Sequence, residues 1–290
     1  MKAILKTIIL LFALSLSLPM LAQNSKIRIW GGAGVPAIQY SDFTGEQSSK
    51  SGFAVGLGYL YSFNKNIALN IGVEYGMYKS EANIRELSTS RSETDIEGMD
   101  FYLRTKMSGY NEKHSVNVIS IPINAEFSLP ISEKINLYAA GGVKLGFVGS
   151  SKYETSIKSF ETRGYYEQWN LELYDIAKYG FVNLNNIDMN GELDVKTNLS
   201  FTFDLGLKFD LGKDYDLYFG GFIDYGLTQA IKHDSYNSIF EYKMVNTSVN
   251  NPMYNNAVSN LNMFETGVVK SARLILTGVK LSFTIPIFKR

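Results

Sequence analysis

Cysteine is absent from the 290 residues of the sequence, and proline occurs only 6 times. The lack of cysteine excludes disulfide bonds, thiolate metal ligands, thiol nucleophiles and a lipid-modified N-terminal cysteine. Net charge is absent too, because 28 Lys and Arg residues balance 28 Asp and Glu residues. This balance argues against a broad basic surface for nucleic acid. The mean hydropathy of -0.06 is far too low for a membrane protein built of several helices.

The only long apolar run lies at the N-terminus. Lys2 and Lys6 precede an apolar stretch over residues 8–18, and Ala22 supplies a small residue for cleavage. Residues 1–22 are therefore predicted to be a secretory signal peptide. The alternative, an N-terminal membrane anchor, is disfavoured because the run is shorter than the ~20 residues that span a bilayer.

From residue 23 onward the apolar residues recur with period two, which is typical of β-strands. In residues 67–77, for example, Ile, Leu, Val, Tyr and Met alternate with Ala, Asn, Gly and Glu. Each such segment has about the length that a tilted strand needs to cross a bilayer. Eight segments follow the pattern, the first of them weakly: 26–38, 53–63, 67–77, 119–129, 135–147, 199–209, 217–227 and 275–287.

The connections between these segments alternate in length. Three are tight, at residues 64–66, 130–134 and 212–215. Four are long and are predicted as outer loops, at about 40–51, 79–115, 149–196 and 230–270. Short and long connections then lie at opposite ends of a closed barrel, as in outer-membrane barrels. Residues 23–290 are thus predicted to form an all-β, eight-stranded antiparallel up-and-down transmembrane barrel.

The residues opposite the large apolar side chains are mostly Gly, Ala and Ser, which suit the crowded lumen of an eight-stranded barrel. A soluble lipid-binding barrel, the alternative, would carry many charges on its outer face. Pro122 lies within a predicted strand and cannot donate a hydrogen bond, so we expect a bulge or a locally unpaired carbonyl beside it.

The signal peptide, the eight amphipathic strands, the long outer loops and the final strand VKLSFTIPIF (residues 279–288) resemble the small outer-membrane β-barrel proteins. The resemblance is to the OmpA/OmpX-like and PorT-like barrel domains, and it covers residues 23–290. It implies an integral protein of the cell outer membrane with a structural, surface-interaction or secretion-apparatus role. It implies neither catalytic residues nor a cofactor, and its partners would be outer-membrane lipid and envelope or secretion-apparatus proteins.

Eight ionisable residues lie on the predicted inner face, four of each sign. Unpaired charges at this depth would be costly to desolvate, so we expect them to pair. Our hypothesis is a salt-bridge network that plugs the lumen, and the alternative is a narrow passive channel for small solutes. The eight residues are Arg28, Glu74, Glu126, Lys144, Asp204, Lys208, Asp224 and Lys280.

The histidines and the third long loop leave further alternatives open. A rim-site lipid-modifying enzyme would need a histidine base near a nucleophile, and the chain offers only His114, beside Ser115, and His233, beside Asp234 and Ser235. Aromatic residues in the loop at 149–196 could form a binding surface, or pack an extension of the barrel wall or a short helix at 171–178. A hidden hairpin there would make the barrel ten-stranded.

Overall fold

A computed structural model describes residues 25–41, 43, 45–95, 97–232, 240–246, 252–258, 262–264 and 268–287. The predicted signal peptide lies outside these residues. Among the described residues, no helix has the length and apolar character needed to cross a membrane.

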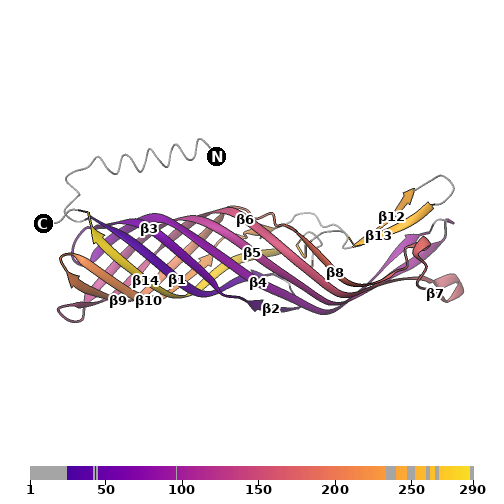
Figure 1. The fold of residues 1–290 in the computed structure, drawn as a ribbon, viewed down its shortest axis with the longest axis horizontal. Helices are drawn as coiled ribbons and strands as arrows, with labels where there is room; N and C mark the ends of the chain where they lie inside the picture. Colours follow the sequence, from indigo (N-terminus) through magenta and orange to yellow (C-terminus); the bar gives the residue numbers. More distant parts are fainter. Residues whose placement is uncertain are drawn as a thin grey trace.

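Eight antiparallel strands form a closed ring (Figure 1). Each pairs with the next, and the first pairs with the last, so that Ile29 lies opposite Phe283. The predicted eight-stranded barrel is confirmed. The strands, in ring order, are β1 (Ser25–Tyr40), β3 (Gly52–Ser62), β4 (Ile67–Thr94), β5 (Asp100–Pro130), β6 (Ile135–Tyr166), β9 (Asn198–Gly212), β10 (Tyr215–Gly226) and β14 (Ser271–Pro286).

The outer wall of the ring is a band of exposed apolar side chains. On β4, residues 67, 69, 71, 73 and 75 are 37–51% exposed, whereas Asn70 and Glu74 between them are 3% exposed. Above this band the outward residues become polar, as at Lys79, Lys113 and Lys152. The band therefore has the amphipathic pattern of strands that face lipid outside and a polar lumen inside.

Pro122 is accommodated without a bulge. It pairs in register with Lys144 on the β6 side. On the β4 side, residues 72 and 73 are missing from an otherwise unshifted ladder. The missing donor of Pro122 thus falls on β4, as expected for a locally unpaired neighbour.

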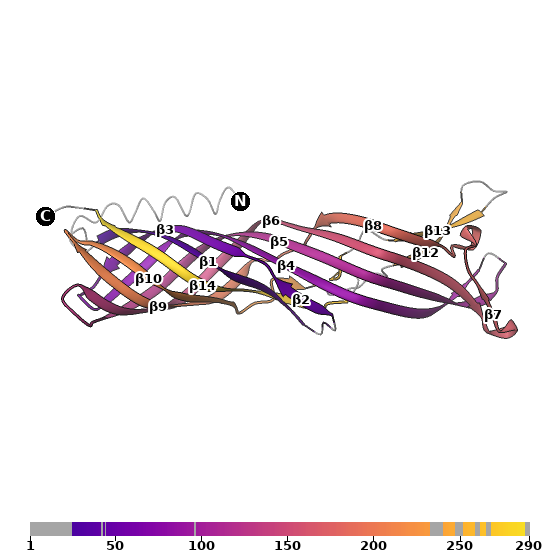
Figure 2. The same cartoon turned by 60° about the horizontal axis from the view of Figure 1, so that its bottom comes forward.

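Two segments predicted as outer loops are largely strand. β4, β5 and β6 continue beyond the barrel, and β8 (Asn183–Glu192) pairs with β6 to complete a four-stranded outer sheet (Figure 2). The prediction of loops at 79–115 and 149–196 was wrong in this respect. Outside the bilayer the outward residues need not be apolar, so the contrast that reveals a strand in sequence is weak there. β8 joins only β6 and stays outside the ring, so the barrel does not become ten-stranded.

Short elements complete the structure. β2 (Glu46–Ser49), within the predicted loop 40–51, pairs with β4. β7 (Leu171–Leu173) pairs with β6 and is flanked by two 3-10 turns in place of the short helix considered at 171–178. In the predicted loop 230–270, β11 pairs with β14, and β12 and β13 form a separate hairpin. These elements are η2 (Glu167–Trp169), η3 (Ala177–Tyr179), β11 (Ile231–Lys232), β12 (Phe240–Asn246) and β13 (Pro252–Val258).

A row of four residues interrupts every ladder of the outer sheet at the same level. Arg85, Gly109, Lys158 and Asn186 lie opposite one another, and none is bridged to its neighbour. Gly109 and Asn186 have φ of 62° and 54°, in the left-handed region. On β5 the buried positions change from odd to even numbers across this row. The row, here called the kink row, therefore turns the strands over while their buried face stays continuous.

Candidate functional site

Most charged residues of the lumen pair between strands that are not neighbours in the ring. Near the short-turn end, the Arg28 guanidinium on β1 donates to Glu126 Oε2 on β5 at 2.7 Å. The Tyr218 hydroxyl on β10 donates to Glu126 Oε1 at 3.1 Å, and its ring lies 4.2 Å below the Arg28 guanidinium carbon. Lys26 lies 2.6 Å and Lys208 3.6 Å from Asp216 Oδ2.

The middle of the lumen holds two further groups of ions. Lys144 Nζ donates to Glu74 Oε1 and to Asp224 Oδ2, both at 2.7 Å. Lys280 Nζ donates to Asp204 Oδ1 at 2.8 Å. These bonds join β6 to β4 and β10, and β14 to β9, so side chains bridge the interior in several directions.

All eight predicted lumen residues point inward and lie in ion pairs. The structure adds Lys26 and Asp216, giving five cations and five carboxylates in these pairs. The sequence signal for Asp216 was its place on the inner face of β10, just beyond the tight turn.

Aromatic rings also fill the lumen. Trp30 is 6% exposed and donates from Nε1 to Glu74 Oε2 at 2.7 Å. Tyr138 and Tyr218 are fully buried and meet edge to face. A Cβ atom on Gly56 would collide with the Trp30 indole, and one on Gly72 would lie 2.7 Å from it. Glycines on β3 and β4 thus make the space that the Trp30 ring occupies.

Little free volume remains between these side chains. The cavity bounded by Arg28, Glu74, Asp204 and Lys280 measures about 10 Å³. This is about the volume needed for a single water molecule. The described side chains therefore leave little open space at this level of the lumen.

The outer half of the lumen contains an apolar cluster and is capped by residues 262–264, here called the cap segment. Met263 and Phe264 are fully buried in a cluster that includes Ile38, Val116 and Leu276. The Met263 backbone N–H donates to both carboxylate oxygens of Glu112, each at 3.2 Å. The cap segment therefore covers the charged network from the outer side.

A buried polar chain lies beneath the cap segment. Ser80 Oγ lies 2.7 Å from Tyr40 Oη, and Tyr40 Oη lies 2.6 Å from His114 Nδ1. His114 Nε2 lies 2.6 Å from Glu112 Oε1. Both ring nitrogens of His114 therefore have hydrogen-bond partners. The Tyr110 hydroxyl also donates to Glu112. Burial is the main cause that raises the pKa of Tyr110 well above its ordinary value, and the negative charge of Glu112 adds to it.

The structure does not join His114 to Ser115. The two residues point to opposite faces of β5, and His114 is 2% exposed beneath the cap segment. His233, Asp234 and Ser235 lie outside the described residues. In the described part of the chain, no group of three or more His, Cys, Asp or Glu side chains could hold a metal ion.

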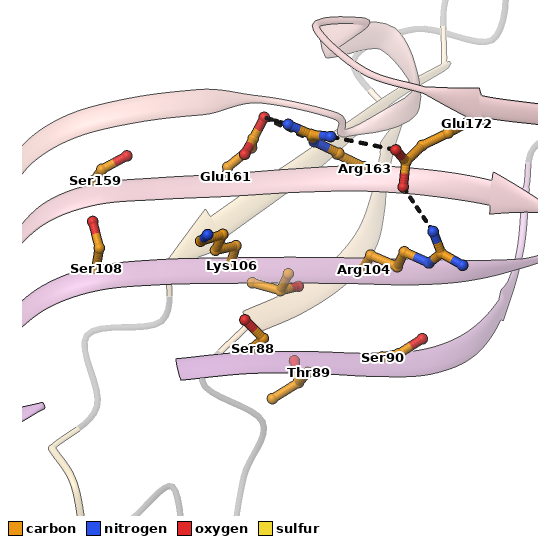
Figure 3. Close-up of a pocket in the computed structure, with 11 residues that line it drawn as sticks. Ser88, Thr89, Ser90, Arg104, Lys106, Ser108, Ser159, Glu161, Arg163 and Glu172 are labelled. Carbon is orange, nitrogen blue, oxygen red and sulfur yellow. Dashed lines mark hydrogen bonds and ion pairs between the residues drawn. The ribbon is translucent and has the colours of Figure 1, made fainter. Parts of the chain in front are cut away.

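The outer sheet has two small cores on one face and a charged groove on the other. Met107 and Phe160 belong to the first core, and Phe101 and Phe181 to the second. The groove on the opposite face, here called the outer groove, has a volume of about 580 Å³ (Figure 3). The aromatic-rich segment at 149–196 is divided: Phe160, Tyr166 and Phe181 are buried in the cores, whereas Tyr174 is 61% exposed. The residues lining the outer groove are Ser88, Thr89, Ser90, Arg104, Thr105, Lys106, Ser108, Ser159, Glu161, Arg163 and Glu172.

The closed ring, the lipid-facing band and the polar lumen define an integral outer-membrane β-barrel protein. Residues 8–250 match the outer membrane protein beta-barrel domain, so the chain belongs to this family. It is similar to Neisserial surface protein A (NspA), with 12% identity and a TM-score of 0.35 over 90% of this chain and 97% of that one. It is also similar to Ail, the attachment invasion locus protein of Yersinia pestis, with 10% identity and a TM-score of 0.27 over 89% of this chain and 99% of that one. No curated protein matches the chain.

Proposed function

We propose that this outer-membrane protein is a non-enzymatic surface protein with a closed lumen, which presents the outer sheet to partners in the envelope or outside the cell. Export through a cleaved signal peptide at residues 1–22 is part of the proposal. The observation that carries it is the combination of a filled lumen with a large sheet above the lipid-facing band. Roles as an envelope scaffold or as part of a secretion apparatus fit the same surface.

The contents of the lumen argue against the narrow-channel alternative. A solute would have to displace the cap segment, and then break ion pairs such as Lys144–Glu74 whose side chains are 3–4% exposed. Recordings in planar bilayers are expected to show no steady conductance for the wild-type protein. A large, constant open state would overturn the closed lumen.

The surface role is tested by crosslinking in living cells. A photoreactive amino acid replaces Tyr174, which directly follows β7 and is 61% exposed. Leu205, which faces lipid and is 48% exposed, serves as the control. Adducts with a protein or polysaccharide are expected at position 174 and not at position 205. The absence of adducts at both positions would contradict the proposal.

The lipid-enzyme alternative requires a histidine that reaches the rim. His114 is instead buried against Tyr40 and Glu112. Replacing both His114 and His233 is expected to leave the lipid composition of the membrane unchanged. A change in acyl-chain composition would support the enzyme instead.

A further inference from the structure

We propose that the outer groove binds a neutral oligosaccharide. This inference rests on the proposed surface role and specifies its ligand. Three observations carry it: the balance of charge in the groove, its density of hydroxyl groups, and the aromatic rings beside it.

Every cation of the outer groove already faces a carboxylate. Arg104 lies 3.0 Å from Glu172 Oε1, and Lys106 lies 3.0 Å from Glu86 Oε1. Arg163 bridges two acids, at 2.7 Å from Glu161 and 3.3 Å from Glu172 (Figure 3). An anionic ligand such as a sulfate would meet donors that are already engaged and carboxylates that repel it. The balance therefore disfavours an anion.

A sugar hydroxyl can use this arrangement, because it both donates and accepts hydrogen bonds. The row of ion pairs from Arg104 through Glu172 to Arg163 presents hydrogen-bond donors and acceptors side by side. Six of the eleven lining residues add serine or threonine hydroxyls. The volume of about 580 Å³ lies within the range of ligand sites, roughly 300–1,000 Å³.

Aromatic rings lie next to the two arginines. The Arg104 guanidinium carbon lies 3.9 Å from the centre of the Tyr165 ring, and that of Arg163 lies 5.9 Å from the centre of the Tyr174 ring. Tyr174 is 61% exposed. An exposed ring offers an apolar, rigid surface with a polar tip, which suits the C–H face of a pyranose.

The test uses the full mature chain in lipid nanodiscs. The probes are maltohexaose, cellohexaose and mannohexaose, with a chondroitin sulfate hexasaccharide as the anionic comparison. Binding of at least one neutral probe, tighter than that of the sulfated one, is expected. A further arm uses neutral polysaccharide extracted from the surface of the producing cells, and tighter binding of it than of the free probes would assign the ligand to the same cell.

Two variants locate the site. Arg104→Gln and Tyr174→Ala are each expected to weaken binding at least about fivefold. Arg85→Gln is the matched control, because its side chain is 86% exposed on the same sheet but pairs with Glu46 away from the groove. Three outcomes would overturn the sugar site. Neither the neutral probes nor the extracted polysaccharide would bind, or the sulfated probe would bind more tightly, or the two variants would bind as tightly as the wild-type protein. Crosslinking to a protein at position 174 would then leave the surface role standing.

Discussion

The backbone N–H of Met263 donates to both carboxylate oxygens of Glu112, 151 residues away in sequence. The contact joins the connection between β10 and β14 to the wall of the barrel, and it does so in a buried site. A carboxylate accepts several donors at once, and Glu112 also receives Thr155 Oγ1 at 2.9 Å. Glu112 is therefore the residue on which the cap segment depends.

Replacing Glu112 with Gln is expected to loosen the cap segment, because the amide group presents donors where four groups now donate to the carboxylate. The absence of native cysteine allows the effect to be measured directly. In a Met263→Cys background, Glu112→Gln should raise the rate of thiol labelling about tenfold, as expected for the loss of one or two charge-assisted hydrogen bonds. Glu154→Gln, on the exposed face of β6, is the control, and equal labelling rates in both variants would refute the dependence.

Removal of Lys144 is expected to destabilise the barrel strongly. Glu74 and Asp224 would remain buried without a cation, and breaking such a pair costs about 3–5 kcal/mol. Urea unfolding in lipid vesicles measures the loss for Lys144→Met. Adding Glu74→Gln and Asp224→Asn should recover most of it, whereas Lys106→Met on the exposed sheet should change the free energy of unfolding by less than about 1 kcal/mol. A similar loss in the exposed variant would argue against a special role for the buried group.

A side chain at Gly56 is expected to displace Trp30 from the lumen. Gly56→Val should lower the free energy of unfolding by about 1–3 kcal/mol, as for an overpacked core. The near-ultraviolet circular dichroism should change as the indole loses its fixed environment. Gly31→Ala is a matched control, because no atom lies within 4 Å of the Cβ that it would add. The proposed packing fails if both variants behave alike.

Adding a side chain at Gly109, a left-handed position of the kink row, is expected to weaken the outer sheet without affecting the barrel. Gly109 has φ of 62°, which costs other residues about 1–2 kcal/mol, and an added Cβ would approach the Lys158 side chain. Gly109→Ala should speed hydrogen exchange in residues 84–110 while leaving exchange in the barrel strands unchanged. Gly149→Ala, whose added Cβ makes only an ordinary contact at 3.8 Å, should leave exchange unchanged. If hydrogen exchange in residues 84–110 were equally slow in both variants, Gly109 would not have this role in the outer sheet.

The sequence predicted the features that depend on one strand at a time. Period-two alternation in the bilayer is strong because one side must be apolar, and it placed Arg28, Glu74 and the other lumen charges on the correct face. It could not pair them, because Arg28 and Glu126 meet across the lumen between strands that are not neighbours. It also missed the outer sheet, where the outward residues are polar and Gly109 reverses the alternation.

The burial of the cap segment could not be predicted from the sequence either, for a different reason. Met263 lies in a stretch without periodicity, and its burial depends on a partner on β5. The small lumen residues were predicted to suit a crowded lumen, but the sequence could not show which rings they make room for, such as Trp30. Volume in a barrel is shared between strands, so it cannot be assigned from one strand alone.

The continuity of β4, β5 and β6 through the membrane boundary has a mechanical consequence. A strand of 31 residues such as β5 can span roughly 100 Å, and the same backbone ladder holds both of its halves. The outer groove is thus held at a fixed height and orientation above the bilayer by strands that continue from the barrel. A ligand that binds there need not immobilise a mobile loop, and a pull on the tip is carried straight into the barrel wall.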